Sequence, residues 1–372
     1  MPWYNTRACE FINIANLFYK GDEEVDLVKK LGFGIIGCGT ISEWHARAIN
    51  AIDGIYLVGV TDVNQNSREK FAKKYGVRAF DSFEQMLECN EVDVVCICTP
   101  SGLHAPLAIQ AAQSGKHIIV EKPMAINLEE ADRMIQACEE NNVKLSVISQ
   151  LRFTKAISKL KDAVDKGLLG KLIMGNIYMK YYRSQEYYDS SGWRGTWKMD
   201  GGGALMNQGI HGIDLLQYVM GKVKTVFAHA KTLARNIEVE DSAVAVLEFE
   251  NGALGTIQGT TSIYPGFPRV LEINGDKGSI ALQEDSIVKW IIEGQETPEG
   301  IIDGEDANKY KSASDPTQFG IEGHILQIKD MAHAIWEDRK PLVDQYEGRK
   351  PIEIIMAIYE SSKTGKLVTI GK

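Results

Sequence analysis

The sequence lacks the features that mark membrane, secreted and nucleic-acid-binding proteins. No apolar run approaches the ~18 residues that cross a bilayer, and the opening residues lack the basic-then-apolar order of a signal peptide. No basic stripe is present, because the 41 Lys and Arg are scattered among 50 Asp and Glu and the net charge is −9. We therefore expect a cytoplasmic protein that binds neither membrane nor nucleic acid.

Cysteine is scarce, and its spacing gives no sign of a metal cluster or a redox pair. The six cysteines include no C-x-x-C motif, and two of them lie in the apolar run VVCIC, which is typical of a strand. Zinc sites need Cys or His in close pairs near turns, whereas the seven His are dispersed. We expect no metal and interpret the cysteines as small core residues in a reducing compartment. They are Cys9, Cys38, Cys89, Cys96, Cys98 and Cys138.

The chain is long enough for two domains, with an extension before them. Its 372 residues are 44% hydrophobic and 24% charged, which is typical of a globular protein. Residues 1–30 precede the first predicted strand and carry no recognisable chemistry. Lys20-Gly21-Asp22 can be encoded AAA GGA GAT, a purine-rich ribosome-binding sequence, and Val25 can be encoded GTG. The hypothesis is that residues 1 to about 24 are translated leader; a full-length intact mass, expressed from the chain's own upstream DNA, would contradict it.

Residues 31–150 alternate short apolar runs with polar segments of helical length. This alternation predicts an α/β domain with a parallel, doubly wound sheet covered by helices on both faces, the Rossmann arrangement that binds dinucleotides. Six runs fit strands, at 32–36, 55–61, 77–80, 92–99, 117–121 and 143–149.

The first run leads into a glycine-rich turn of the form G-x-G-x-x-S, and the turn opens a predicted helix near Ser42. Gly37 permits a tight turn, and Gly39 lets the backbone approach a pyrophosphate. The helix N-terminus, with Thr40 and Ile41, supplies unpaired N–H groups and a positive dipole end. Ser42 replaces the usual third Gly or Ala, and its small side chain should still allow close packing.

The second run ends at Asp62, twenty residues after Ser42. A carboxylate here can accept hydrogen bonds from both hydroxyls of the adenosine ribose and would repel the 2′-phosphate of NADP. No Arg or Lys follows until Arg68, so the sequence favours NAD over NADP. Capping of the next helix is an alternative role for Asp62, and the two roles are compatible.

Three further stretches resemble the Gfo/Idh/MocA oxidoreductase family, which is named for glucose–fructose oxidoreductase and inositol dehydrogenase. They are Thr99-Pro100-Ser101-Gly102-Leu103-His104, Glu121-Lys122-Pro123, and Gly201-Gly202-Gly203-Ala204-Leu205-Met206-Asn207-Gln208-Gly209-Ile210-His211. The resemblance extends from about Leu31 to the C-terminus. The first two stretches follow the fourth and fifth strands, where ligands bind to doubly wound sheets. The cofactor residues that we expect here are Thr99, Pro100, His104, Glu121, Lys122 and Gln150.

Lys122 is a candidate catalytic residue at the nicotinamide end of the cofactor site. A Lys directly after a buried strand can position a substrate hydroxyl, and its pKa falls if it is partly desolvated. The alternative is a surface Lys beside a turn proline. The resemblance implies the catalytic role and a cis bond before Pro123.

Asn207 and His211 are four residues apart in a predicted helix, so both side chains would lie on one face. The resemblance implies that His211 is the general acid/base and Lys122 its partner, with an Asp usual at position 207. A neutral amide orients a hydroxyl but does not favour an imidazolium as a carboxylate does, which puts the Lys-Asp-His relay in doubt. Asp214 either compensates or is a structural partner or surface charge.

Residues 151–372 predict an α+β domain with a large, mostly antiparallel sheet that binds substrate and self-associates. A helix is expected at 154–166 and others at 321–337 and 345–363, with a polar loop at 297–316. Such a sheet, half covered by helices, leaves a face for a homo-oligomer, a dimer or tetramer, as the resemblance also implies. The strands are expected at 171–183, 223–233, 242–249, 253–262, 269–274 and 278–282.

The segments at 181–188 and 193–197 combine aromatic rings with hydrogen-bonding groups, a mixture that suits the faces and hydroxyls of a sugar. They resemble the branch of the family that oxidises sugar C3 positions, including UDP-N-acetylglucosaminuronate 3-dehydrogenases. Core packing is the alternative for such aromatics. The expected substrate residues are Tyr182, Trp193, Arg194, Asn207 and His211.

Together these patterns predict an NAD-dependent oxidoreductase that moves a hydride between a secondary alcohol of a sugar, sugar derivative or cyclitol and the nicotinamide. His211 with Lys122 would handle the hydroxyl proton. A second hypothesis is a glycosidase that retains NAD, oxidises a sugar carbon transiently and eliminates the aglycone. A third is a non-catalytic NAD-binding regulator, whose function would survive substitution of Lys122 or His211.

Overall fold

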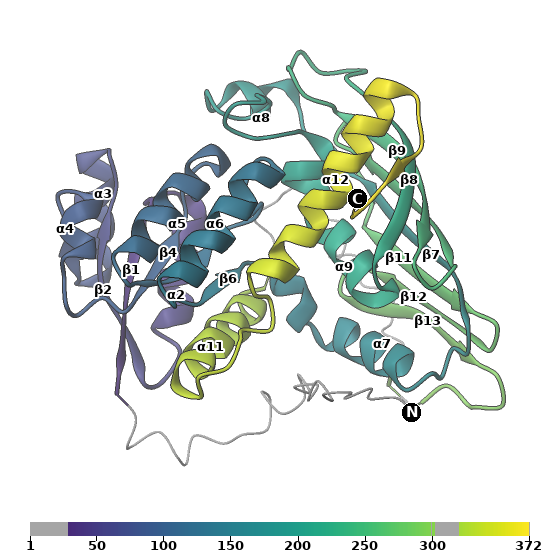
Figure 1. Ribbon diagram of the computed structural model, residues 1–372, viewed down its shortest axis with the longest axis horizontal. Helices are drawn as coiled ribbons and strands as arrows, with labels where there is room; N and C mark the ends of the chain where they lie inside the picture. Colours follow the sequence, from purple (N-terminus) through teal and green to yellow (C-terminus); the bar gives the residue numbers. More distant parts are fainter. Residues whose placement is uncertain (1–28, 299, 302–319, 372) are drawn as a thin grey trace, which may run out of the picture.

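The computed structural model describes residues 29–298, 300–301 and 320–371, which form two sheets with helices on and between them (Figure 1). The leader hypothesis and nearly all of the extension expected at 1–30 lie outside the described residues, as does most of the loop expected at 297–316. None of the helices in the described part of the chain has the length and apolar character of a bilayer span.

The first sheet confirms the doubly wound prediction. Its six strands are parallel and lie in the order β3-β2-β1-β4-β5-β6, so the order reverses between β1 and β4. In sheets of this kind a ligand binds beyond the carboxyl ends of the strands on either side of that reversal. Each strand falls within or next to a predicted run: β1 Leu31–Ile36, β2 Ile55–Thr61, β3 Arg78–Ala79, β4 Val94–Ile97, β5 His117–Val120 and β6 Leu145–Val147.

Helices pack on both faces of this sheet because their apolar sides match its buried strands. The residues of β1 are all buried, and Ala46, Ala48 and Ile49 of the first helix pack in the same core. That helix begins at Thr40, two residues before the predicted start. The helices are α2 Thr40–Ile49, α3 Gln65–Tyr75, α4 Phe83–Leu87, α5 His104–Gln113 and α6 Leu128–Glu140, with a 3-10 turn η2 at Ser101–Leu103.

The second sheet is mostly antiparallel, as predicted, and has eight strands in the order β13-β12-β11-β7-β10-β9-β8-β14. The pair β7 and β10 is parallel. The strand expected at 171–183 ends earlier, at Lys180, and the edge strands β13 and β14 were not predicted. The strands are β7 Leu172–Lys180, β8 Val223–Lys231, β9 Ser242–Phe249, β10 Leu254–Thr260, β11 Val270–Gly275, β12 Gly278–Gln283, β13 Ser286–Ile292 and β14 Val368–Thr369.

Helices α9 and α12 cover one face of the second sheet, and the C-terminal helices α11 and α12 connect this sheet to the first. Helix α9 packs on β7, and α12 packs on β8, α6 and β6, between the two sheets (Figure 1). Helix α11 packs on α2, and its Ile328, Met331 and Ala332 enter the core of the first sheet. These elements are η3 Gln150–Phe153, α7 Lys155–Asp165, α8 Gln185–Asp189, the π-helical turn η4 Ala204–Gly209, α9 Ile210–Met220, α11 Glu322–Trp336 and α12 Gln345–Thr364.

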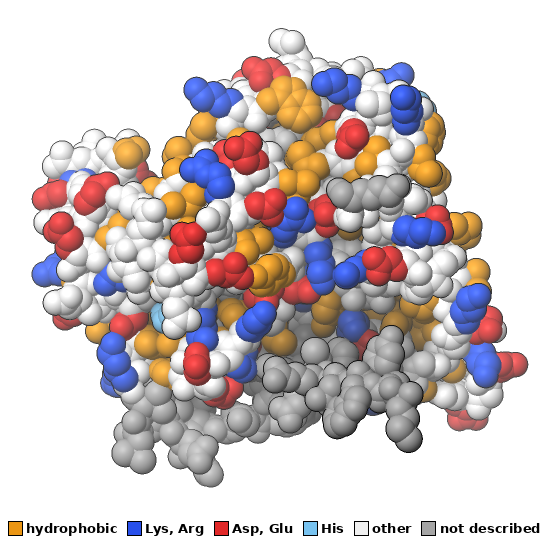
Figure 2. All heavy atoms as spheres, in the orientation of Figure 1, with side chains coloured by type: hydrophobic (Ala, Val, Ile, Leu, Met, Phe, Trp, Pro, Cys, Tyr) orange, Lys and Arg blue, Asp and Glu red, His pale blue; other side chains and the backbone are white. Residues whose placement is uncertain are grey.

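Figure 2 shows acidic and basic side chains interspersed over one face of the molecule, without an extended area of either sign. This agrees with the scattered charges of the sequence.

Candidate active site

The glycine-rich turn has the backbone that close approach of a phosphate requires. Gly37 has φ +95°, and a Cβ there would lie 2.6 Å from the carbonyl oxygen of Cys98. A Cβ at Gly39 would point into open space, and Gly39 supplies no side-chain cap for α2. The first N–H groups of α2, from Thr40 onward, are therefore available to an anion. Ser42 is fully buried, as expected for a small residue at the helix packing surface.

Asp62 lies beside this turn at the end of β2. Its Oδ2 accepts a hydrogen bond from the N–H of Cys38 at 2.7 Å, and its Oδ1 accepts one from the N–H of Asn64 at 2.7 Å. A carboxylate has about four acceptor positions, so two remain for the two ribose hydroxyls. The N-cap of α3 is Asn64, so the helix-capping alternative for Asp62 is wrong. Arg68 donates to the backbone carbonyls of Asp62, at 3.4 Å, and Asp81, at 3.1 Å, and its ion pair is with the side chain of Asp81 rather than with the carboxylate of Asp62.

His104 joins the two loops that follow β4 and β5. Its Nδ1 is 2.7 Å from the carbonyl oxygen of Pro123, and its Nε2 is 2.9 Å from that of Thr99. Burial lowers the pKa of His104, and a neutral ring can donate to only one of these carbonyls. The Lys122–Pro123 bond is cis, as the resemblance implied. His104 thus lies behind the site, and its direct contact with a cofactor stays a prediction.

Glu121 is held by a buried histidine. Its Oε1 is 2.8 Å from Nε2 of His45 and 3.9 Å from Nε2 of His324. Burial would raise the pKa of Glu121, but the hydrogen bond with His45 and the nearby His324 and Lys122 lower it to about 2. The fold therefore gathers two histidines that are far apart in the sequence around one carboxylate, a grouping of possible metal ligands that their spacing did not suggest.

Two buried polar atoms fit a cofactor at this edge of the sheet. Oγ1 of Thr99 and Oε1 of Gln150 have no hydrogen-bond partner among the described residues. Buried polar groups are normally satisfied, so these atoms favour a polar ligand. With the open turn at Gly39 and the free acceptor positions of Asp62, they fit a dinucleotide. The individual cofactor contacts of Thr99, Pro100 and Gln150 stay predictions.

Lys122, Asn207 and His211 meet at the junction of the two sheets. The ammonium of Lys122 donates to the backbone carbonyl of Asn207 at 3.0 Å. Burial lowers the pKa of Lys122, whereas the charges of Glu121 and Asp200 raise it. Burial and the charge of Lys122 lower the pKa of His211 to about 3, and the ring hydrogen-bonds to none of the described residues. A neutral imidazole beside an ammonium can accept the proton of an alcohol.

The helix expected over 207–211 is only partly correct. Asn207 lies in a π-helical turn, and the regular helix α9 begins at Ile210. Short π-helical segments recur at functional sites. Asn207 and His211 therefore come from two consecutive elements rather than from successive turns of one helix.

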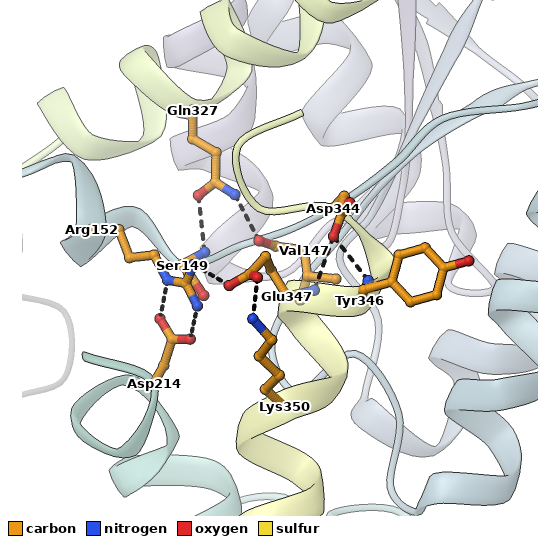
Figure 3. Close-up of polar contacts among 9 residues, drawn as sticks. All are labelled: Val147, Ser149, Arg152, Asp214, Gln327, Asp344, Tyr346, Glu347 and Lys350. Carbon is orange, nitrogen blue, oxygen red and sulfur yellow. Dashed lines mark hydrogen bonds and ion pairs between the residues drawn. The ribbon is translucent and has the colours of Figure 1, made fainter. Parts of the chain in front are cut away.

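Asp214 does not compensate for the missing carboxylate at position 207. Both of its oxygens accept from Arg152, at 2.8 Å from Nε and 2.5 Å from Nη2 (Figure 3). The two side chains are each 3% exposed. Its predicted alternative, a structural partner, is confirmed.

The predicted substrate residues divide into two groups. The guanidinium of Arg194 lies 4.3 Å from the ring centre of Tyr187 and 5.5 Å from that of Trp193, and its charge affects Lys122. Tyr182 instead packs edge-on against Tyr264, with ring centres 5.2 Å apart. The charge of Arg194 thus acts on Lys122, with Trp193 beside Arg194, whereas Tyr182 belongs to a separate aromatic contact. The roles of all three residues in substrate binding stay predictions.

Sequence reasoning missed three residues of the site. Arg183 is buried and donates through Nε and Nη2 to Oε1 of Gln208, and Gln208 in turn donates to Oδ1 of Asn207. Asp200 is also buried and accepts from Asn207. The signal for Asp200 was its position directly before the three glycines. Alternation along a strand could have separated Arg183 from Tyr182.

Comparison with known proteins gives matches over both halves of the chain. Residues 31–149 match the family described as an oxidoreductase family with an NAD-binding Rossmann fold, and residues 157–281 match the GFO/IDH/MocA C-terminal domain. Myo-inositol 2-dehydrogenase from Thermotoga maritima is 32% identical over 256 residues, 66% of this chain and 73% of that protein.

Solved structures match nearly the whole chain. The WlbA dehydrogenase from Bordetella pertussis, in complex with NADH and UDP-GlcNAcA, is 35% identical with a TM-score of 0.84, over 92% of this chain and 99% of the other. A levoglucosan dehydrogenase in complex with NADH and levoglucosan is 25% identical with a TM-score of 0.82, over 92% and 100% of the two chains.

Proposed function

We propose, from the premise that this chain belongs to the Gfo/Idh/MocA family of oxidoreductases, that it oxidises one secondary alcohol of an acidic sugar derivative. The coarser activity follows from the family and its members: the chain is an NAD-dependent oxidoreductase that acts on a CH–OH group of a sugar or cyclitol. The observation that carries the oxidation is that Lys122, Asn207 and His211 come together at the edge of the NAD-binding sheet.

The chain's own residues divide the work between cofactor and substrate. The glycine-rich turn and α2 would hold the pyrophosphate, and Asp62 the adenosine ribose. When bound, NAD supplies the acceptor for the hydride that leaves the alcohol carbon. We propose residues 31–150 as the cofactor domain and 151–372 as the domain that shapes the substrate site.

The hydroxyl proton would go to His211. Its imidazole is neutral in this site because burial and Lys122 lower its pKa to about 3. The free ring nitrogen would accept the hydrogen bond of the hydroxyl and take its proton as the hydride leaves, and the reverse reaction returns the proton. The ammonium of Lys122, anchored on the Asn207 carbonyl, would hold the alcohol oxygen and stabilise negative charge that develops on it.

An acidic substrate is supported by the cations around this centre. The charges of Arg183 and Arg194 both lower the pKa of Lys122, so both guanidinium groups lie near enough to this centre to act on a bound carboxylate as well. Arginine is suited to carboxylates and phosphates. The WlbA relative binds UDP-GlcNAcA, a nucleotide-linked sugar acid. We therefore propose a nucleotide-linked uronate as the first substrate class to test, with C3 as the carbon oxidised.

The test measures the absorbance of reduced nicotinamide after the protein and NAD are mixed with a panel of possible substrates. The panel contains UDP-sugars with a carboxylate at C6, UDP-sugars without one, free sugars and cyclitols. We expect sustained NADH formation with an acidic sugar and a loss of about 10²- to 10⁴-fold in kcat for Lys122→Ala. Lys70→Ala, at an exposed lysine of α3, is the matched control. Aglycone release without net NADH would instead support the glycosidase, and activity that survives Lys122→Ala would contradict the assigned role.

We also propose a homo-oligomer in the cytoplasm. The face of the second sheet turned away from α9 and α12 exposes apolar side chains of neighbouring strands, which a second copy would cover. They include Met174, Phe227, Val244, Val246 and Leu254. The five described cysteines are free thiols, which supports a reducing compartment. Cell fractionation that recovered the protein outside the cytoplasm would contradict this location.

A further inference from the structure

Asn207 stands in contact with a buried carboxylate. Its Nδ2 donates to Oδ1 of Asp200 at 2.6 Å, and Oδ2 of Asp200 accepts from the N–H of Gly195 at 2.9 Å. Asp200 is 1% exposed and forms no ion pair with a described residue. A buried carboxylate without a salt bridge destabilises the folded protein. The presence of Asp200 in contact with Asn207 therefore points to a role other than stability.

The charge of Asp200 and the charge of Lys122 affect each other's pKa. Burial raises the pKa of Asp200 to about 6, against the opposing hydrogen bonds of Gly195 and Asn207 and the charges of Lys122 and Arg194. In return, the charge of Asp200 raises the pKa of Lys122. The two charges therefore act on each other across the site without touching.

Asp200 also determines how the Asn207 amide is turned. An ionised carboxylate only accepts hydrogen bonds, so the amide must present Nδ2 to it and leave Oδ1 for Gln208, whose Nε2 donates at 3.1 Å. The backbone of Asn207 holds the ammonium of Lys122. Asp200, Asn207 and Lys122 thus form a continuous chain of contacts.

We infer that Asp200 is the carboxylate of this active site: it acts through Asn207 as a positioning residue, fixing the amide and keeping Lys122 protonated beside the substrate hydroxyl. The inference rests on the proposed function, because the roles of Lys122 and His211 are assigned there. Position 207 can then carry a neutral amide, because the negative charge lies one contact farther from the substrate, at a residue seven positions earlier in the chain.

Other titratable and charged groups also surround Lys122 and Asp200. These groups are the same in all of the variants that test the inference. Around Lys122 they are Glu121, Arg183, Arg194, His104 and His211. Around Asp200 they are Arg194, Tyr187, Tyr188 and Tyr359.

The first experiment measures the titration of Lys122 without substrate. Competitive labelling of the folded protein with acetic anhydride over a pH series, read by mass spectrometry of the Lys122 peptide, gives the pKa of that amine. Asp200→Asn should lower this pKa by about one unit, because the carboxylate no longer favours the ammonium. An unchanged titration in a folded variant would overturn the inference.

The swapped variant Asp200→Asn with Asn207→Asp separates charge from structure. It keeps the side-chain hydrogen bond with donor and acceptor exchanged, and the new amide oxygen at 200 can still accept from Gly195. We expect it to restore the pKa of Lys122 to the unsubstituted value or above. A folded swapped variant with the lowered pKa of Asp200→Asn would show that the carboxylate has only a structural role.

Activity supplies the second readout. In Asp200→Asn the alkaline limb of kcat/KM should move to lower pH, with about a tenfold loss above that limb and an unchanged KM for NAD. Asp241→Asn is the matched control, because Asp241 is an equally buried carboxylate whose hydrogen bonds go to the backbone at 233–235. If the unsubstituted protein forms no NADH with any sugar, the proposed function fails, and the labelling experiment still decides the role of Asp200.

Discussion

Asp62 shows how one side chain can set the cofactor preference. Its two oxygens already accept from the backbone N–H groups of Cys38 and Asn64, which fixes the carboxylate before any ligand arrives. A fixed acceptor loses little entropy on binding. Its charge would also lie where the 2′-phosphate of NADP would have to enter.

Asp62→Ala should therefore lower kcat/KM with NAD by roughly tenfold or more and narrow the difference between NAD and NADP, since a charge-assisted hydrogen bond contributes about 1.5–3 kcal/mol. The measurement is kcat/KM with each cofactor. Asp53→Asn, at an exposed carboxylate before β2, should leave both values unchanged. A variant that kept the original preference would argue against contact between Asp62 and the ribose.

Motifs in the sequence pointed to the residues that we propose to act directly, and contacts in the fold pointed to the residue that we propose to act through another. Lys122 and His211 follow recognisable patterns, because direct chemistry demands particular residue types at particular places. Asp200 was missed because its role depends on a contact with Asn207 that only the turn around Gly195 creates. For the same reason Tyr182 was chosen over its neighbour Arg183, although the fold directs Arg183 toward Gln208.

At the scale of elements, a buried ionic group joins three segments of the chain. Arg152 of η3 bonds Asp214 of α9 through two nitrogens and Glu347 of α12 through the third, at 2.8 Å (Figure 3). Gln327 of α11 lies close by and bonds the backbone at Val147 and Ser149. The helix that carries His211 is therefore fixed relative to the edge of the cofactor sheet.

Removing one partner of this ionic group should strongly destabilise the folded protein. We expect Arg152→Met to lower the free energy of unfolding by about 3–5 kcal/mol, because it leaves Asp214 buried and unpaired. Adding Asp214→Leu should recover most of that loss. Urea unfolding followed by fluorescence measures both, and Lys166→Met, in the exposed pair with Asp162, should cost less than about 1 kcal/mol. Equal losses in the single and double variants would contradict this account.

The periodicity of the sequence predicted the elements well where burial is regular. All six strands of the first sheet were anticipated, and the clearest signals came from buried strands such as β1 and β4, because a strand covered on both faces is a continuous apolar run. The edge strand β13 was not, since its pattern of buried and exposed residues is irregular and its pairing with β12 shifts register. The π-helical turn at Asn207 is also hidden from periodicity, because a segment of six residues is too short to show its own repeat.

At the scale of the molecule, the exposed face of the second sheet gives a test of assembly. Val246 is 52% exposed and pairs across the sheet with Phe227. Val246→Glu should convert a dimer or tetramer to a species of about one chain, because burial of a new charge opposes association. Light scattering measures the molar mass. Val63→Glu, at a fully exposed valine of the first half, should leave the molar mass unchanged. A monomeric unsubstituted protein would contradict the proposed assembly.

The return of α11 to the first sheet has a consequence for anyone who recombines this protein with a relative. Helix α11 packs against α2, the helix that begins at the glycine-rich turn, and places Ile328 and Met331 in the core there. A chimaera joined at residue 150 alone would set a foreign cofactor half against a native α11, with mismatched side chains at their shared surface. The unit of exchange is discontinuous: residues 31–150 travel together with 322–336.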